Sequence, residues 1–340
     1  ILAALNAASI PVIVLKGAYL AQTVYPQLHL RQMRDIDLLI PKDRIIQANK
    51  ILQSQGYAVG SQYADLFNAT AEVRIAQNQG HHITPLKRGA GLPLVELHWT
   101  LCDAHEAYDF LLAEVWQRAK PITLWGEPAL TLCPEDLLLH LCHHAAYHHT
   151  FDLGLRNLID ITRIVANFQD TIDWVALQQT AENWRWQRGV YLTFALTNRL
   201  FGLALPDFIQ EAIEQTLPQG DFVAQTQTLL LQPKGMNQAL TKAVTIKQSY
   251  GGWNIPIRIK KVLERIFPPP TAMAEAYPVQ GSYLSPRLYR YYGQRLITYL
   301  PYRIKTMAGE LQALRFFRQT QEYQPAIANH KAYLHGWLKV

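Results

Sequence analysis

The chain has 340 residues, of which 49% are hydrophobic and 17% are charged, and its formal net charge is +6. A chain of this size and composition can bury a large core and is expected to divide into two or three domains. No apolar run approaches the roughly 18 residues of a membrane span, and the three cysteines lack CxxC spacing, which together predict a cytoplasmic protein with reduced thiols.

The first predicted elements are a buried strand over residues 11–15 and a short helix over residues 18–25, joined by Lys16 and Gly17. A glycine between a strand and a helix lets the backbone approach a ligand closely. The first turn of the helix also offers free N–H groups to a phosphate. This turn is therefore a candidate phosphate-binding element.

The most informative stretch, residues 30–41 (LRQMRDIDLLIP), places Asp35 and Asp37 two residues apart. In a strand, residues i and i+2 point to the same face, so both carboxylates meet beside an apolar run. Two like charges about 4 Å apart repel by roughly 4 kcal/mol at an effective dielectric near 20. The pair therefore needs Mg²⁺, a neighbouring arginine, or a raised pKa in one carboxyl group. Because Arg31 and Arg34 lie just upstream, a structural salt bridge is the alternative to a metal site.

A further strand is predicted within residues 93–101 (PLVELHWTL). Its alternation places Glu96 and His98 on one face and apolar side chains on the other. A third carboxylate is thus available from a separate strand, and a supporting hydrogen bond is the expected role of His98.

These motifs, in this order, resemble the uncharacterised nucleotidyltransferase family of the DNA polymerase β-like superfamily. The resemblance rests on Lys-Gly, on Arg-x-x-x-Asp-Ile-Asp-Leu-Leu and on Val-Glu-Leu-His-Trp, and it covers roughly the first third of the chain. Residues 134–164 also resemble the helical region of that family. The chain departs from the superfamily at Lys16-Gly17, where Gly-Ser is usual, and in its longer interval from Gly17 to Asp35.

The resemblance implies an enzyme that depends on Mg²⁺ or Mn²⁺. It would transfer a nucleoside monophosphate from an NTP, with ATP favoured, to an unknown acceptor and release pyrophosphate. Asp35 and Asp37 are implied to hold the metal ions, and Glu96 to complete the nucleophile-side site or to accept the proton of the acceptor.

The same resemblance implies phosphate binding at the Lys-Gly turn. The backbone of Gly17 would pass close to the phosphates, and Lys16 and Arg31 would neutralise their charge. The departure at this turn bears on the choice of nucleotide more than on metal binding.

A helical region is predicted from Pro134, where acidic residues precede the periodic apolar stretch LLLHLCHHAAYHH. Within it His140, His144 and His148 recur at four-residue spacing and share one face. Three successive turns of one straight helix cannot all reach one ion, so a zinc site on this stripe is disfavoured.

Four polar residues of this region match the family's His-x-x-x-His, Leu-Arg and Asp pattern: His144, His148, Arg156 and Asp160. The resemblance implies that they line the cleft, with His148 or Arg156 near phosphate. The alternative is a polar network that ties two helices together, and the sequence does not choose between the two.

Charge is distributed unevenly along the chain. Residues 1–239 carry 17 Lys and Arg against 22 Asp and Glu, whereas residues 240–340 carry 15 against 4. This basic, tyrosine-rich end predicts contacts with nucleic acid or with an anionic membrane surface. The alternative is docking on the acidic part of the same chain, which we favour because the tyrosines supply more aromatic area than a solvated arm can leave exposed.

The predicted fold class is α+β, with a polymerase β-like nucleotidyltransferase domain over residues 1–125, a helical domain over 126–235 and a basic C-terminal region over 236–340. The first domain is expected to contain a mixed sheet backed by helices. Strands are expected near residues 11–15, 36–40, 80–86, 93–100 and 120–124, and helices near 1–9, 42–55 and 105–118.

Two other functions are compatible with the sequence: a non-catalytic descendant of the fold that binds a nucleotide or a partner, and an RNA-binding protein that acts through its basic end. Three converging carboxylates disfavour the first, and the acidic balance of residues 1–239 disfavours the second. The GxSxG, GxxxxGK(S/T), HExxH and GxGxxG motifs do not occur, which removes their enzyme classes from consideration.

Overall fold

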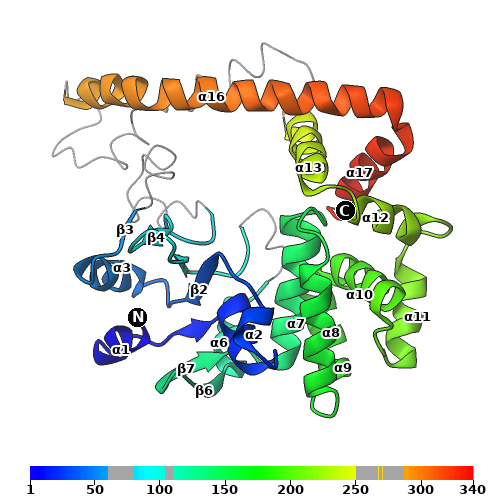
Figure 1. Cartoon of the computed structure of the whole chain (residues 1–340), viewed down its shortest axis with the longest axis horizontal. Helices are drawn as coiled ribbons and strands as arrows, with labels where there is room; N and C mark the ends of the chain where they lie inside the picture. Colours follow the sequence, from blue (N-terminus) through cyan, green and yellow to red (C-terminus); the bar gives the residue numbers. More distant parts are fainter. Residues whose placement is uncertain (60–79, 104–109, 250–266, 268–269, 271–286, 340) are drawn as a thin grey trace.

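The computed structural model describes residues 1–59, 80–103, 110–249, 267, 270 and 287–339. Figure 1 shows a sheet-containing part, formed by the N-terminal residues, beside a helical part, with the long helix α16 running across the top of the view. A mixed sheet followed by helices was the predicted fold class, and it is confirmed.

The sheet has seven strands in the order β3-β4-β5-β2-β1-β7-β6. Strand β2 is parallel to β5, and β1 is parallel to β7, whereas the other neighbouring strands are antiparallel. Central strands bury apolar side chains on both faces, as Leu38 and Leu39 do in β2. The strands are β1 (Ile13–Val14), β2 (Asp35–Leu39), β3 (Ala58–Val59), β4 (Leu86–Lys87), β5 (Leu94–His98), β6 (Lys120–Leu124) and β7 (Glu127–Thr131).

Short helices pack against this sheet: α2 contacts β2, α3 contacts β5, and α1 contacts β7. Each presents an apolar side, and Ile45, Ala48 and Leu52 of α3 are buried at i, i+3 and i+7. The helices of this part are α1 (Leu2–Ala7), α2 (Lys16–Thr23), α3 (Ile45–Ser54) and α6 (Leu112–Arg118), with a 3₁₀ turn at Leu28–Leu30.

The helical part begins at α7, which has Pro134 in its first turn together with two acidic residues that favour a helix N-terminus. A π-helical turn, η2 (His144–His148), continues α7 directly. The helices are α7 (Pro134–His143), α8 (Arg156–Phe168), α9 (Trp174–Asn183), α10 (Gln187–Phe201), α11 (Asp207–Thr216), α12 (Phe222–Leu230), α13 (Lys234–Ser249), α16 (Arg287–Tyr323) and α17 (Pro325–Trp337).

Strand β7 differs from the prediction, which began the helical domain at residue 126 and included no strand after residue 124. Trp125 and Gly126 both have positive φ, at 51° and 81°, and they form the tight turn that joins β6 to β7. Such turns usually carry Asn-Gly or Asp-Gly, so Trp-Gly gives a weak signal in the sequence. The strand predicted near residues 80–86 is also shorter than expected. In that stretch the structure has an isolated bridge at His82 and the start of β4. The helix predicted near residues 105–118 lies partly outside the described residues.

The C-terminal helix α17 packs against α12, α13 and α16. Its Lys331 side chain is fully buried, and Nζ donates to the Thr150 carbonyl oxygen at 2.6 Å and to Asn237 Oδ1 at 2.9 Å. The described end of the basic region thus packs on the helical part, while its binding to nucleic acid or a membrane surface stays a prediction. Every helix in the described part of the chain is too short or too polar to span a bilayer.

We predict that Lys331 makes the stability of the protein rise with pH above neutrality. Burial lowers the pKa of Lys331 from 10.5 to about 7, against an opposing effect of Asp152. Between these two pH values the unfolded state binds the proton that the folded state has lost, so the free energy of unfolding increases with pH. Urea denaturation at several pH values should show this increase in the wild type and a flatter profile in Lys331→Met. Replacement of the exposed Lys50 by Met should leave the profile unchanged.

Candidate active site

The three carboxylates predicted to bind metal lie on two neighbouring strands. Strand β2 carries Asp35 and Asp37, and the parallel strand β5 carries Glu96, whose Cα pairs in register with that of Asp37. Residues in register on adjacent strands point to the same face, as do residues two apart on one strand. The strand pairing therefore brings all three side chains to one face of the sheet.

Asp37 is buried, with 5% of its surface exposed, and it has two cationic neighbours. Lys16 Nζ lies 3.7 Å from Oδ2, and His98 Nε2 donates to Oδ1 at 2.9 Å. Burial works to raise the pKa of Asp37, but Lys16 and His98 outweigh it and hold the pKa well below its usual range. Asp37 is therefore a permanent anion at neutral pH.

Asp35 has the opposite electrostatic environment. Burial raises the pKa of its carboxyl, and the negative charges of Asp37 and Glu96 raise it further. A cation shared between these oxygens would relieve this repulsion, and carboxylate oxygens are the ligands that Mg²⁺ and Mn²⁺ prefer. The donor set therefore fits a hard divalent ion.

Glu96 is held by two imidazoles. Its Oε2 lies 3.6 Å from His98 Nε2 and 3.8 Å from His82 Nε2. Burial works to raise the pKa of Glu96, but His98 and His82 lower it, so the side chain is ionised. Burial works to lower the pKa of His98, whereas Asp37 and Glu96 raise it above its usual value. His98 thus supports both carboxylates from within the core.

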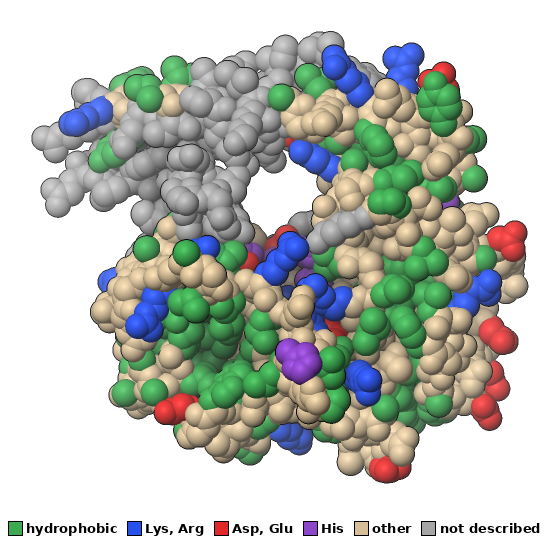
Figure 2. Space-filling model, in the orientation of Figure 1, with side chains coloured by type: hydrophobic (Ala, Val, Ile, Leu, Met, Phe, Trp, Pro, Cys, Tyr) green, Lys and Arg blue, Asp and Glu red, His purple; other side chains and the backbone are tan. Residues whose placement is uncertain are grey.

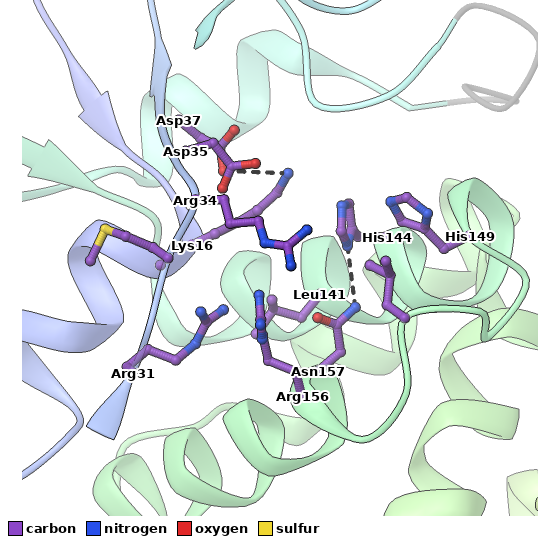
Figure 3. Close-up of a pocket in the computed structure, with 13 residues that line it drawn as sticks. Lys16, Arg31, Arg34, Asp35, Asp37, Leu141, His144, His149, Arg156 and Asn157 are labelled. Atoms are coloured by element: carbon purple, nitrogen blue, oxygen red, sulfur yellow. Dashed lines mark hydrogen bonds and ion pairs between the residues drawn. The ribbon is translucent and has the colours of Figure 1, made fainter. Parts of the chain in front are cut away.

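A cavity of about 260 Å³ opens beside Asp35 and Asp37. Figure 3 shows this cavity between the sheet part and helices α7 and α8. In Figure 2, Lys and Arg side chains, drawn in blue, gather near the centre of the view. Cationic and polar side chains dominate the lining, which comprises Lys16, Gly17, Arg31, Met33, Arg34, Asp35, Asp37, Leu141, His144, His149, Leu153, Arg156 and Asn157. A positive cavity that meets two carboxylates suits a metal-bound polyphosphate.

The Lys-Gly turn is the first turn of α2, because the helix begins at Lys16 rather than at residue 18 as predicted. Lys16 adopts φ of 41°, a left-handed conformation that costs free energy in any residue with a Cβ. Gly17 packs closely on its neighbours: a Cβ there would lie 3.2 Å from Met33 Cβ, which is tighter than most such contacts. The turn therefore directs the Lys16 side chain toward Asp37.

Arg31 lines the cavity, yet its guanidinium is bonded within the protein. Nε and Nη2 donate to the two carboxylate oxygens of Asp160 at 2.7 and 2.8 Å, and Tyr25 Oη donates to the same carboxylate at 2.7 Å. Asp160 has no exposed surface and is absent from the described lining of the cavity. This bidentate pair joins the sheet part to α8.

We predict that Asp160→Asn destabilises the protein by about 3–5 kcal/mol, because it leaves the charge of Arg31 buried without its partner. Urea denaturation of the two proteins measures this difference in the free energy of unfolding. Asp170→Asn, which removes an exposed carboxylate after α8, serves as the control and should change stability by less than about 0.5 kcal/mol. An equally small change in Asp160→Asn would contradict a structural role for the pair.

The other predicted residues of the helical part divide into two groups. His144 and Arg156 line the cavity, and Asn157 Nδ2 donates to His144 Nδ1 at 3.2 Å. His148 instead lies against His81, with ring centroids 5.0 Å apart. Glu96, His98 and His148 are not among the described residues that line the cavity.

Sequence reasoning did not assign a site role to Arg34, His149 or Asn157, all of which line the cavity. Arg34 had a signal in its position immediately before Asp35. His149 follows the predicted stripe by one residue, and no local pattern marks Asn157.

Two comparisons with known proteins bear on the family of this chain. A search of curated proteins found no match. The sequence model of the uncharacterised nucleotidyltransferase family matches residues 1–202, which include the whole sheet and the helices through α10. Since this match spans more than half of the chain, the protein belongs to the uncharacterised nucleotidyltransferase family.

Proposed function

We propose that the protein transfers a nucleoside monophosphate from an NTP, with ATP favoured, to an acceptor and releases pyrophosphate. The observation that carries this proposal is a group of three carboxylates on two paired strands, two of which, Asp35 and Asp37, line a cavity rich in Lys and Arg. Family membership supports nucleotidyl transfer in general, and the donor and acceptor are our inference.

Asp35 and Asp37, with Glu96 beside them, would hold Mg²⁺ or Mn²⁺. When bound, such an ion would neutralise phosphate charge and lower the pKa of an attacking hydroxyl. Lys16, Arg34 and Arg156 line the cavity and can bind phosphate oxygens. The cavity is smaller than the roughly 300 Å³ of a typical ligand pocket, so we assign it to the phosphates rather than to the whole nucleotide.

The proton of the acceptor hydroxyl must be taken up as the new P–O bond forms. Glu96, in register with Asp37 on the neighbouring strand, would accept it, because Asp35 and Asp37 would be bound to the metal ion. Asp37 stays ionised through its contacts with Lys16 and His98. The leaving pyrophosphate would carry away the electron pair of the broken P–O bond, and the cationic side chains of the cavity would stabilise its charge.

Pyrophosphate release tests this proposal. Each of the four NTPs is incubated with Mg²⁺ or Mn²⁺ and with a pool of metabolites or RNA, and the transfer of an α-phosphate label is followed in parallel. We expect pyrophosphate and label transfer in equal amounts, with ATP the best donor. Release of inorganic phosphate from the γ-position without label transfer would contradict nucleotidyl transfer.

A further inference from the structure

Histidine rings from the sheet part and the helical part form one continuous cluster, which reaches the carboxylates through the contacts of His98 with Asp37 and Glu96. Neighbouring rings in this cluster have centroids between 4.5 and 6.4 Å apart. Its members are His81, His82, His98, His140, His144, His148 and His149, seven of the 12 histidines in the chain. Seven imidazolium charges could not be accommodated together at such distances, so most of these rings must be neutral and able to act as metal ligands.

One part of the cluster brings together three potential metal ligands. His81, Asp103 and His148 each offer a ligand atom, and these atoms all lie within 4.8 Å of one another. His81 precedes β4 and is fixed beside the end of β5, because Trp99 N donates to its carbonyl oxygen at 3.0 Å. His148 ends the π-helical turn η2, so the three ligands come from both parts of the structure.

The chemistry of this group differs from that of the three carboxylates. Two imidazoles and one carboxylate form a donor set that suits Zn²⁺ and similar transition metals, whereas Mg²⁺ prefers oxygen ligands. His81 Nδ1 and Asp103 Oδ1 lie 2.5 Å apart. A metal binds the neutral form of imidazole, and the crowding of His81 by the neighbouring rings of His82 and His98 favours that form.

We propose that His81, His148 and Asp103 bind a transition-metal ion of the Zn²⁺ type, at a site distinct from the Asp35 and Asp37 pair. The ion would join the sheet part to the helical part and would keep a fourth coordination position open. Bonds of about 2.0–2.2 Å place ligand atoms roughly 3.5 Å apart, so binding would rearrange these three side chains. His81 and Asp103 lie outside regular strands and helices, where such adjustments cost least.

The test uses the full chain freed of metal with a chelator and titrated with Co²⁺, whose absorption spectrum reports nitrogen ligands. In excess Mg²⁺, which fills the carboxylate site, we expect one Co²⁺ per chain with the spectrum of nitrogen ligands, and we expect Zn²⁺ to displace it. Loss of a residue that supports a metal ligand typically weakens metal binding by about 10–100-fold. Loss of a ligand itself should cost more, so we expect His81→Ala and His148→Ala to weaken Co²⁺ binding by more than about 100-fold and Asp103→Asn to weaken it by at least about tenfold. His29→Ala, which removes an exposed histidine outside the cluster, should bind as the wild type does.

A second set of variants separates this site from the carboxylates. Asp37, Glu96 and His98 also offer ligand atoms within 4.8 Å of one another. Asp35→Asn and Glu96→Gln should retain the Co²⁺ spectrum, whatever their effect on pyrophosphate release. If Co²⁺ binding is lost in Glu96→Gln but kept in His81→Ala and Asp103→Asn, the proposed site is wrong. If the alanine variants unfold, two other measurements decide the question. Unchanged Co²⁺ affinity in Asp103→Asn, or a wild-type melting temperature that does not rise with Zn²⁺, would contradict the proposed site.

Discussion

Asp35→Asn and Asp37→Asn are each expected to lower nucleotidyl-transfer turnover by about 10³-fold or more. A divalent ion contributes several kcal/mol of transition-state stabilisation, and each 1.36 kcal/mol is a factor of ten in rate. Turnover of saturating NTP and acceptor, measured as pyrophosphate release, gives the ratio directly. Asp43→Asn, which removes an exposed carboxylate just after β2, should keep wild-type turnover.

The same two variants should move stability in opposite directions. The raised pKa of Asp35 means that its ionised form is disfavoured in the folded state, so Asp35→Asn should increase the free energy of unfolding. Asp37→Asn removes the buried partner of Lys16 and His98 and should decrease it by roughly 3 kcal/mol or more. Two variants with equal effects on stability would contradict the electrostatic description of the site.

Lys16→Ala is expected to lower turnover by about a hundredfold, the usual cost of losing one preorganised donor. Lys16 lines the cavity and lies 3.7 Å from Asp37, so its charge is placed where phosphate oxygens would bind. Steady-state kinetics should show the loss mainly in kcat. Lys50→Ala, on the exposed side of α3, is the matched control.

Lys16→Gly separates the charge of this residue from its backbone conformation. Glycine adopts the left-handed conformation of Lys16 without strain, yet it lacks the ammonium group. We expect the same hundredfold loss in Lys16→Gly as in Lys16→Ala. Wild-type turnover in Lys16→Gly would show that the backbone conformation, and not the charge, is what the site requires.

The parts of the site that follow from strand periodicity could be predicted from the sequence. Asp35, Asp37 and Glu96 lie on the same face because side chains point to alternate faces along a strand. That alternation can be recognised within the few residues of a single strand. The prediction of a mixed sheet did not include which strands pair, and the pairing of β2 with β5 is seen only in the folded chain. Strand β7 was not predicted, since its turn lacks the residues that usually signal one.

Contacts between distant residues could not be predicted. Arg31 and Asp160 are separated by 129 positions, and each has a plausible local role, so their pairing is apparent only in the folded chain.

The contacts of the histidine stripe could not be predicted for a different reason. The π-helical turn η2 contains an i→i+5 bond from His149 N to the His144 oxygen, and His148 in this turn is stacked on His144 while it also contacts His81 of the sheet part.

The most direct test of the proposed active site is a calorimetric titration with Mn²⁺ and a non-hydrolysable ATP analogue. The analogue is titrated into the full chain with and without Mn²⁺, and then into the Asp35→Asn, Asp37→Asn double variant. We predict binding to the wild type that requires Mn²⁺ and is lost in the double variant, while circular dichroism shows that the variant remains folded. Unchanged Mn²⁺-dependent affinity in the folded double variant would contradict the assignment of Asp35 and Asp37 as metal ligands.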